Sequence, residues 1–394
     1  SETIALLLRR GDTARAFEFS DRARARSMYE QLGRTTILEN ATTAEQLRGA
    51  LPPRTALVEY ALLPDAIVIF YFTPSWSGVV RAPAAQAAVR TLVEQSVDLL
   101  QHRGDMEAVH RATAALYRQL IVPVARELAG ANRLIIVPDR QLHTVPWAAL
   151  WDAPRGRYLI DDAALSVAPS GSALLLTKRS TTLTPVLVIG DPHDEGIAPL
   201  PEAAREAEEI AAMYDSSTLL ESEHATRARF ITGAQKSGMI HYAGHAESDA
   251  TDPFGALHLA ADHAHESGDL DTTAIAALHL DKAPLVILAA CGTMRGESQH
   301  VEGMPSIARA FLAAGARSVV GTLWEVDDDV VAPLFRRMHQ ELRNGASASA
   351  ALRTAQIALA HDPDPRLRHP ASWAPVELLG YSLEQTNSGD KRSK

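Results

Sequence analysis

The sequence predicts an α/β protein whose mostly parallel sheet is sandwiched between helices. Short apolar runs, typical of buried strands, alternate along most of the chain with longer segments whose apolar residues recur at helical spacing. This alternation produces right-handed crossovers, parallel strands and helices on both faces of the sheet. Ligands bind such sheets beyond the carboxyl ends of the strands, so residues that follow an apolar run are candidates for chemistry.

Length and composition narrow the class of protein. The 394 residues exceed one ordinary core and indicate several domains. A net charge of −10 argues against a general nucleic-acid binder, because phosphate contacts need clustered Lys and Arg. The single cysteine excludes an intrachain disulfide and a multi-thiolate zinc site, and it fits a reducing compartment. Because no apolar run approaches about 18 residues, we expect a cytoplasmic protein without membrane contact.

The first half of the chain divides into two expected parts. Residues 1–50 form a short helical segment, in which Asp12 caps the main helix. Residues 51–182 open with the strands ALVEYALL and AIVIFYFT, which make a hairpin around Pro64-Asp65. Two long helical patterns follow at 83–103 and 106–129, and RLIIVPD is a further buried strand.

In the second half, residues 183–385, the expected strands and helices alternate more regularly. A helix begins near Pro201, and Asp327–Asp329 are expected to cap the helix VVAPLFRRMHQELRNG. The polar tail 386–394 is expected to be disordered. Strands are expected at 184–192, 238–246 and 283–292, in RSVVGTLWEV and in APVELLG.

Two reactive side chains stand just past the carboxyl ends of apolar strands. The chain's only cysteine, Cys291, ends the run APLVILAACG, and His245 follows the strand MIHYA through a glycine. A thiol needs a nearby base to become a nucleophile, and neighbouring parallel strands lie about 4.8 Å apart. If the two strands are neighbours, His245 can serve as the base for Cys291. The backbone N–H groups of Cys291 and Ala246 are then candidates for an oxyanion hole.

Simpler explanations exist for each of these residues. A lone cysteine at a strand end is often only a small core residue. His241 is a competing base, but it lies about 13 Å back along the strand at about 3.3 Å per residue, so we interpret it as structural. The segment DHAHE, with His258 before it, matches no standard ligand spacing, and we expect neither a metal nor another cofactor.

The segments HYAGHAE, LVILAACGT, PSIARAFLAAGARSVVGTLWEVDDD and HPASWAPVELLG, in this order, resemble the CHAT domain. LIIVPDRQLHTVPWAAL in the first half fits the same family. The resemblance implies a caspase-like fold related to that of separase, with residues 51–182 as a pseudo-protease half and 183–385 as the protease half. It also implies that residues 1–50 end an array of tetratricopeptide (TPR) repeats. The absence of cysteine from the first half agrees with a pseudo-protease.

The resemblance implies a function as well. It maps a catalytic dyad onto Cys291 as nucleophile and His245 as general base, in a cysteine endopeptidase that cleaves a specific protein partner. A regulatory protein, or upstream TPR or sensor domain, would control it, in some relatives within bacterial defence. The alternative is a catalytically silent caspase-like scaffold or protein-interaction module.

Substrate binding is where this sequence departs from the family. The position two before the nucleophile helps to form the primary specificity pocket in caspase relatives, where an acidic residue favours basic substrates. Here it is Ala289, which carries no charge and leaves the specificity open. Trp324, Glu325 and Asp327 follow the next strand, where relatives form the substrate groove. Their alternative roles are a buried tryptophan, a solvated glutamate and a helix cap.

Overall fold

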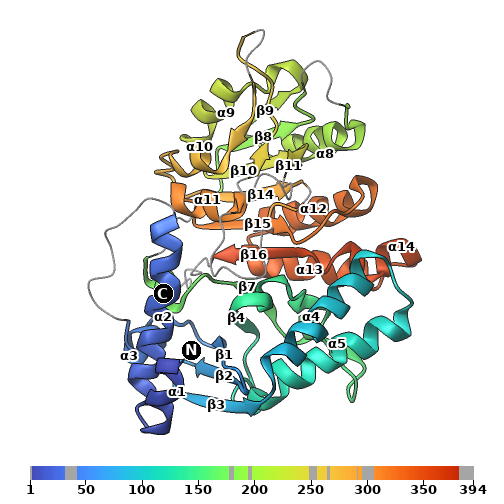
Figure 1. Cartoon of the computed structure of the whole chain (residues 1–394). Coiled ribbons are helices and arrows are strands. Elements are labelled where there is room, and N and C mark those ends of the chain that lie inside the picture. Colours follow the sequence, from blue (N-terminus) through green and yellow to red (C-terminus); the bar gives the residue numbers. More distant parts are fainter. Residues whose placement is uncertain are drawn as a thin grey trace, which may run out of the picture.

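The computed structural model describes residues 2–31, 42–176, 182–193, 198–247, 255–263, 267–290, 292–294 and 306–380. An eleven-stranded sheet runs through these residues in the order β3-β2-β1-β4-β7-β16-β15-β14-β10-β8-β9 (Figure 1). Its strands are β1 Thr55–Leu62, β2 Ala66–Phe72, β3 Ser77–Pro83, β4 Arg133–Val137, β7 Ala164–Val167, β8 Val186–Gly190, β9 Ser217–Glu221, β10 Met239–Ala243, β14 Leu285–Ala289, β15 Ser318–Thr322 and β16 Val376–Gly380.

The expected mostly parallel α/β sheet is confirmed. Only the ladders β1–β2, β2–β3 and β15–β16 are antiparallel among the pairings of this sheet in the described chain. The last strand, β16, pairs in parallel with β7 and antiparallel with β15, so it joins the strands of the first half to those of the second. One continuous sheet therefore underlies both halves of the chain.

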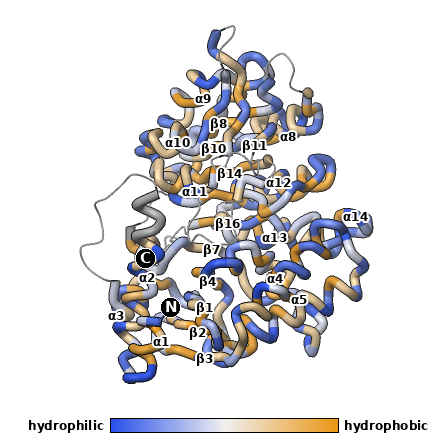
Figure 2. The backbone as a smooth tube through the Cα atoms, in the orientation of Figure 1, coloured by the Kyte–Doolittle hydropathy of each residue, from blue (hydrophilic) through white to orange (hydrophobic). Residues whose placement is uncertain are grey.

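Helices cover both faces of the sheet. Alternate strand residues face opposite sides, so in β10 Met239 and Ala243 pack in one core and Ile240 and Tyr242 in the other. Figure 2 shows hydrophobic and hydrophilic residues mixed along the covering helices, as amphipathic packing requires. The helices in the second half are α8 Pro201–Ala212, α9 Arg227–Ala234, α10 Thr272–Ala276, α11 Ile307–Ala314, α12 Asp328–Arg343, α13 Ala348–Ala360 and α14 Pro365–Arg368.

The first half departs from expectation in its details. The expected hairpin is present as β1 and β2, but β3 and β7 were not predicted. The helical pattern of 106–129 forms α5 only over Met106–Leu120, because Pro123 lacks a backbone donor and lies in a 3-10 turn. The other helices there are α1 Glu2–Arg9, α2 Thr13–Gln31, α3 Ala44–Ala50, α4 Gln86–Gln101, α6 Leu159–Asp162 and α7 Gly171–Leu176. None of the helices in the described chain is long and apolar enough to cross a membrane.

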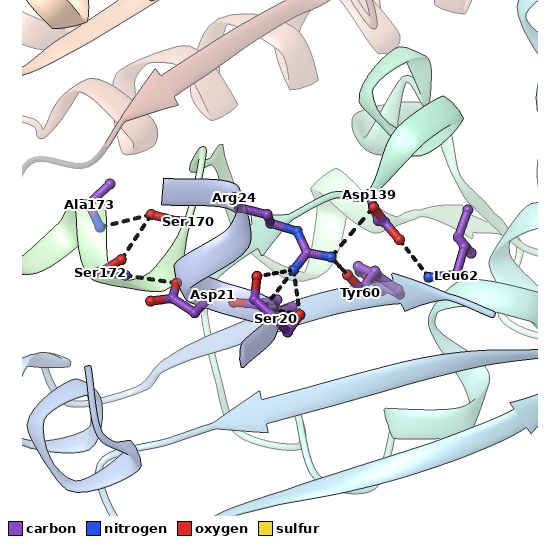
Figure 3. Close-up of polar contacts among 10 residues, drawn as sticks. Ser20, Asp21, Arg24, Tyr60, Leu62, Asp139, Ser170, Ser172 and Ala173 are labelled. Atoms are coloured by element: carbon purple, nitrogen blue, oxygen red, sulfur yellow. Dashed lines mark hydrogen bonds and ion pairs between the residues drawn. The ribbon is translucent and has the colours of Figure 1, made fainter. Parts of the chain in front are cut away.

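A buried ionic network fastens α2 to the sheet (Figure 3). Arg24 reaches from α2 to β1, where Nη1 lies 2.8 Å from Oε1 of Glu59. The second terminal nitrogen of Arg24, Nη2, lies 3.6 Å from Oδ1 of Asp139, just beyond β4. It also donates to the carbonyl oxygen of Tyr60. Ser20, one turn earlier, donates to Glu59 at 2.7 Å. The side chain of Glu59 is fully buried, and this burial raises its pKa to about 8 even beside Arg24.

Candidate active site

The strands that lead to His245 and towards position 291 are neighbours. β10 and β14 pair in parallel, with Ala243 opposite Ala289, which confirms the adjacency on which the site depends. The Gly244 N–H also donates to the Ala289 carbonyl at 3.4 Å, so the two strand ends stay joined. Cys291 itself lies outside the described residues.

The imidazole of His245 is held by a backbone carbonyl. Its Nε2 lies 2.8 Å from the oxygen of Ala198, three residues before α8. A carbonyl can only accept, so Nε2 carries the proton and Nδ1 keeps a free lone pair. No sequence pattern points to Ala198, because any residue can supply a carbonyl.

Tyr242 and a small sheet support the turn that carries His245. The buried Tyr242 hydroxyl lies 2.6 Å from the carbonyl oxygens of both His245 and His258. The His258 N–H donates to the same His245 carbonyl at 3.1 Å. These contacts belong to a three-stranded sheet of β11 Ala246–Glu247, β12 Ala256–Leu257 and β13 Leu270–Asp271.

The register of this sheet determines where the Ala246 N–H points. Ala246 lies opposite Leu257, and the adjacent bond from the His258 N–H to the His245 carbonyl makes this a non-hydrogen-bonded pair. In such a pair the N–H groups point away from the partner strand. The Ala246 N–H is therefore not used by the β11–β12 ladder.

Three of the residues expected to bind substrate lie on one cavity. Trp324, Glu325 and Asp327 line a cavity of about 610 Å³, which Arg103 borders from the first half of the chain. Trp324 is buried, and its indole N–H donates to the Ala371 carbonyl at 3.4 Å. The fourth expected residue, Ala289, is buried in the core at the end of β14.

The expected helix cap at α12 is wrong in one respect. Asp327 occupies the N-cap position, but its side chain makes no capping hydrogen bond, and its main-chain carbonyl accepts from Val330 instead. Its exposed carboxylate is thus not committed to the helix end. The neighbouring Asp328 is half-buried, and burial followed by the nearby Glu206 raises its pKa, while the nearby His245 opposes this rise.

A chain of buried polar groups lies behind the site. His241, in the core as expected, has Nε2 3.0 Å from Glu206 of α8 and Nδ1 3.2 Å from His339 of α12. The Nδ1 of His339 lies 2.9 Å from the Tyr214 hydroxyl. Burial raises the pKa of Glu206 to about 8 and lowers that of His241 to about 3, so at neutral pH the Glu206 carboxyl group is mostly protonated and the His241 imidazole is neutral. The chain thus links α8, β10 and α12 through neutral groups.

The comparison with known families decides the classification. The profile of the CHAT domain matches residues 110–381. This chain belongs to the CHAT domain family. The CHAT chain is 25% identical over 325 residues to Tetratricopeptide repeat protein 28 of Homo sapiens, covering 68% of this chain and 13% of that protein. It is 26% identical over 326 residues to the Mus musculus protein of that name, with the same coverage. The chain thus spans 13% of the length of these curated relatives.

Solved structures share the fold of this CHAT chain. A crystal structure of the Saccharomyces cerevisiae separase–securin complex matches with a TM-score of 0.64 and 10% identity, covering 93% of this chain and 33% of that chain. A second structure of that complex matches with a TM-score of 0.57, 11% identity, and coverage of 93% and 34%. The expected caspase-like fold, related to that of separase, is confirmed.

The histidine-rich segment of the CHAT chain makes local contacts. His258 Nδ1 lies 2.5 Å from Asp269, and the carboxylate of Asp262 accepts from the Ala228 N–H at the start of α9. His265 and Glu266 lie outside the described residues. Among the described residues, no group of three or more His, Cys, Asp or Glu side chains could hold a metal ion.

Proposed function

We propose that this CHAT domain is a cysteine endopeptidase with Cys291 as nucleophile and His245 as general base. One observation carries the proposal: Ala243 and Ala289 are paired in register, and His245 and Cys291 each follow by two residues. Neighbouring strands are about 4.8 Å apart, so equal offsets beyond paired residues bring the imidazole within reach of the thiol.

The bonding of His245 supports its role in each proton transfer. Nδ1 takes the thiol proton, and the thiolate sulfur of Cys291 attacks the scissile carbonyl carbon. The imidazolium, stabilised by the Ala198 carbonyl, returns the proton to the leaving amine as the C–N bond breaks. Water then hydrolyses the thioester in the reverse sequence. The Ala246 N–H, free of the β11–β12 ladder, and the Cys291 N–H donate to the oxyanion.

We propose a protein substrate that lies along the cavity beside β15. Trp324 supplies an apolar wall, and Glu325 and Asp327 supply exposed carboxylates. Ala289 supplies no charge at the position where caspase relatives form the primary specificity pocket. The single cysteine and its thiolate chemistry suit a reducing, cytoplasmic setting.

We further propose that residues 1–50 end a TPR-like array through which an upstream domain or bound regulatory protein controls the peptidase. The two curated relatives are TPR proteins by name. Arg24 of α2 is inserted between Glu59 of β1 and Asp139 just beyond β4, so a displacement of α2 would leave these buried acidic groups in residues 51–182 without their cation. This pseudo-protease half shares the sheet with the protease half 183–385 and could transmit the displacement.

The thiol reactivity of Cys291 tests the proposal without knowledge of the substrate. Because the chain has one cysteine, iodoacetamide reports on this residue alone. We expect fast alkylation at pH 7 that slows in His245→Ala, since the imidazole promotes the thiolate. Slow alkylation that is the same in both proteins would favour the scaffold alternative.

A further inference from the structure

We propose that Thr322, the last residue of β15, is a positioning residue that aims the backbone N–H of residue 291 into the oxyanion hole. This inference rests on the proposed function and assigns a role to a residue outside the dyad. Thr322 contacts neither His245 nor the cavity residues in the contacts described above. It acts instead on the peptide groups on either side of the nucleophile.

The Thr322 hydroxyl bridges the two neighbours of position 291. Its Oγ1 donates to the Ala290 carbonyl at 2.8 Å and accepts from the Gly292 N–H at 3.0 Å. A hydroxyl has one proton and can accept as well, so it can make both bonds at once. The side chain is buried, so water cannot readily replace it.

The geometry of the peptide group explains how this hydroxyl bridge can affect catalysis. The Ala290 carbonyl belongs to the same peptide group as the N–H of residue 291. In a planar trans peptide the two bonds point in opposite directions, so fixing the carbonyl also fixes the N–H. Because the carbonyl points towards Thr322, the N–H is directed away from β15. The Gly292 N–H is already used by Thr322 and is not the oxyanion donor.

The backbone of Thr322 holds the segment that follows. Its N–H donates to Thr293 Oγ1 at 3.1 Å, and its carbonyl accepts from the Met294 N–H at 3.0 Å. The Thr293 carbonyl in turn accepts from Ala308 in α11 at 3.2 Å. At Gly321 an added Cβ would lie 2.6 Å from Thr293 Oγ1, so glycine permits this close approach. Residues 290 and 292–294 are therefore held against β15 on both sides of position 291.

A single amide resonance tests the placement directly. A chain labelled with ¹⁵N-cysteine gives one backbone signal, that of residue 291, because the chain has one cysteine. Thr322→Val keeps the shape of the side chain but lacks the hydroxyl. Thr322→Ala also lacks the hydroxyl and is smaller, whereas Thr322→Ser retains the hydroxyl. We expect the resonance to move in the valine and alanine variants and to stay near its wild-type position in the serine variant.

Steady-state kinetics test whether the Thr322 hydroxyl affects catalysis. We expect both hydroxyl-free variants to lower kcat about tenfold or more at little changed KM, since loss of a whole oxyanion donor costs about 10²–10³ in kcat. Iodoacetamide alkylation, which forms no oxyanion, should change far less, and Thr322→Ser should restore kcat. The proposal is overturned if kcat stays at the wild-type level without the hydroxyl, if alkylation falls in proportion to kcat, or if both hydroxyl-free variants fail to fold. A wild-type protein that is inactive even in its full-length natural context would instead reject the peptidase function, and the amide resonance would still test the placement.

Discussion

The Nε2 of His245 lies 2.8 Å from the backbone carbonyl oxygen of Ala198. This contact joins the strand-end turn after β10 to the segment before α8. It selects the tautomer in which Nδ1 is the acceptor, and it compensates the positive charge that forms when Nδ1 takes a proton. A side chain that keeps this contact but cannot take a proton separates the two roles of the imidazole.

His245→Gln is that side chain. Its amide nitrogen can still donate to the Ala198 carbonyl, but glutamine has no basic nitrogen. We expect kcat/KM to fall about 10²–10⁴-fold, the usual contribution of a general base, while the melting temperature stays close to that of the wild type. His245→Ala is the matched control and should lose as much activity. A glutamine variant that retains activity within a few fold would exclude His245 as the base.

Removal of Arg24 should destabilise the chain strongly. Arg24→Met leaves the fully buried carboxylate of Glu59 without its cation. Breaking a buried ion pair from one side costs about 3–5 kcal/mol, so denaturant unfolding at about pH 9, above the Glu59 pKa of about 8, should show a loss in this range. Arg24→Met combined with Glu59→Gln should recover part of it, because no buried charge remains at position 59. If the double variant is no more stable than Arg24→Met, the pair does not anchor α2.

The buried Glu206 should make stability depend on pH. Its pKa of about 8 lies above the ordinary value near 4.5, because of burial first, with Arg336 opposing and Glu209 adding to the rise. The folded state therefore favours the protonated carboxyl, and this contribution is lost as pH rises from about 4.5 to 8. His241, whose pKa is lowered to about 3, has the opposite sign: its contribution is lost as pH falls from about 6.5 to 3.

Glu206→Gln removes the part of the pH dependence of stability that comes from Glu206. Glutamine is close to glutamate in size and shape but cannot ionise. In melting curves from pH 5 to pH 9, the stability of the variant relative to the wild type should rise up to about pH 8 and then level off. A constant difference across this range would mean that Glu206 does not change its ionisation on unfolding.

Asp327 should matter for substrate and hardly for stability. Its side chain makes no cap bond, so Asp327→Ala should change the free energy of unfolding by less than about 0.5 kcal/mol, while raising KM for the cleaved protein. Asp271→Ala is the contrasting control, because Asp271 accepts from the Ala274 N–H at 2.7 Å and caps α10. Loss of a cap costs about 1 kcal/mol. Equal losses of stability in both variants would show that Asp327 has a capping role.

The sequence allowed prediction of the features that depend on local pattern. The apolar run before Ala290 and the strand before Gly244 are buried on both faces, as central strands of a parallel sheet should be. Short or irregular elements could not be predicted from the sequence. β7 has only four residues, Ala164–Val167, and one of them is partly exposed, so its pattern is too short to distinguish from a loop.

Contacts made by backbone atoms were beyond prediction. The Ala198 carbonyl and the peptide groups held by Thr322 are independent of residue type, so the sequence carries no sign of them. The position of β16 between β7 and β15 was also hidden, because sheet order depends on tertiary packing. The dyad could be proposed from the sequence because a cysteine and a histidine are chemically distinctive and stand at comparable strand ends.

Cleavage by the wild-type chain and its Cys291→Ala variant tests the peptidase function most directly. Both proteins, each in its full-length natural context, are incubated with a library of peptides derived from cellular proteins, and new termini are identified by mass spectrometry. We expect the wild type to create a reproducible set of cleavages that is absent from Cys291→Ala and from His245→Gln. The same cleavages at the wild-type rate in Cys291→Ala would contradict the assignment of Cys291 as nucleophile.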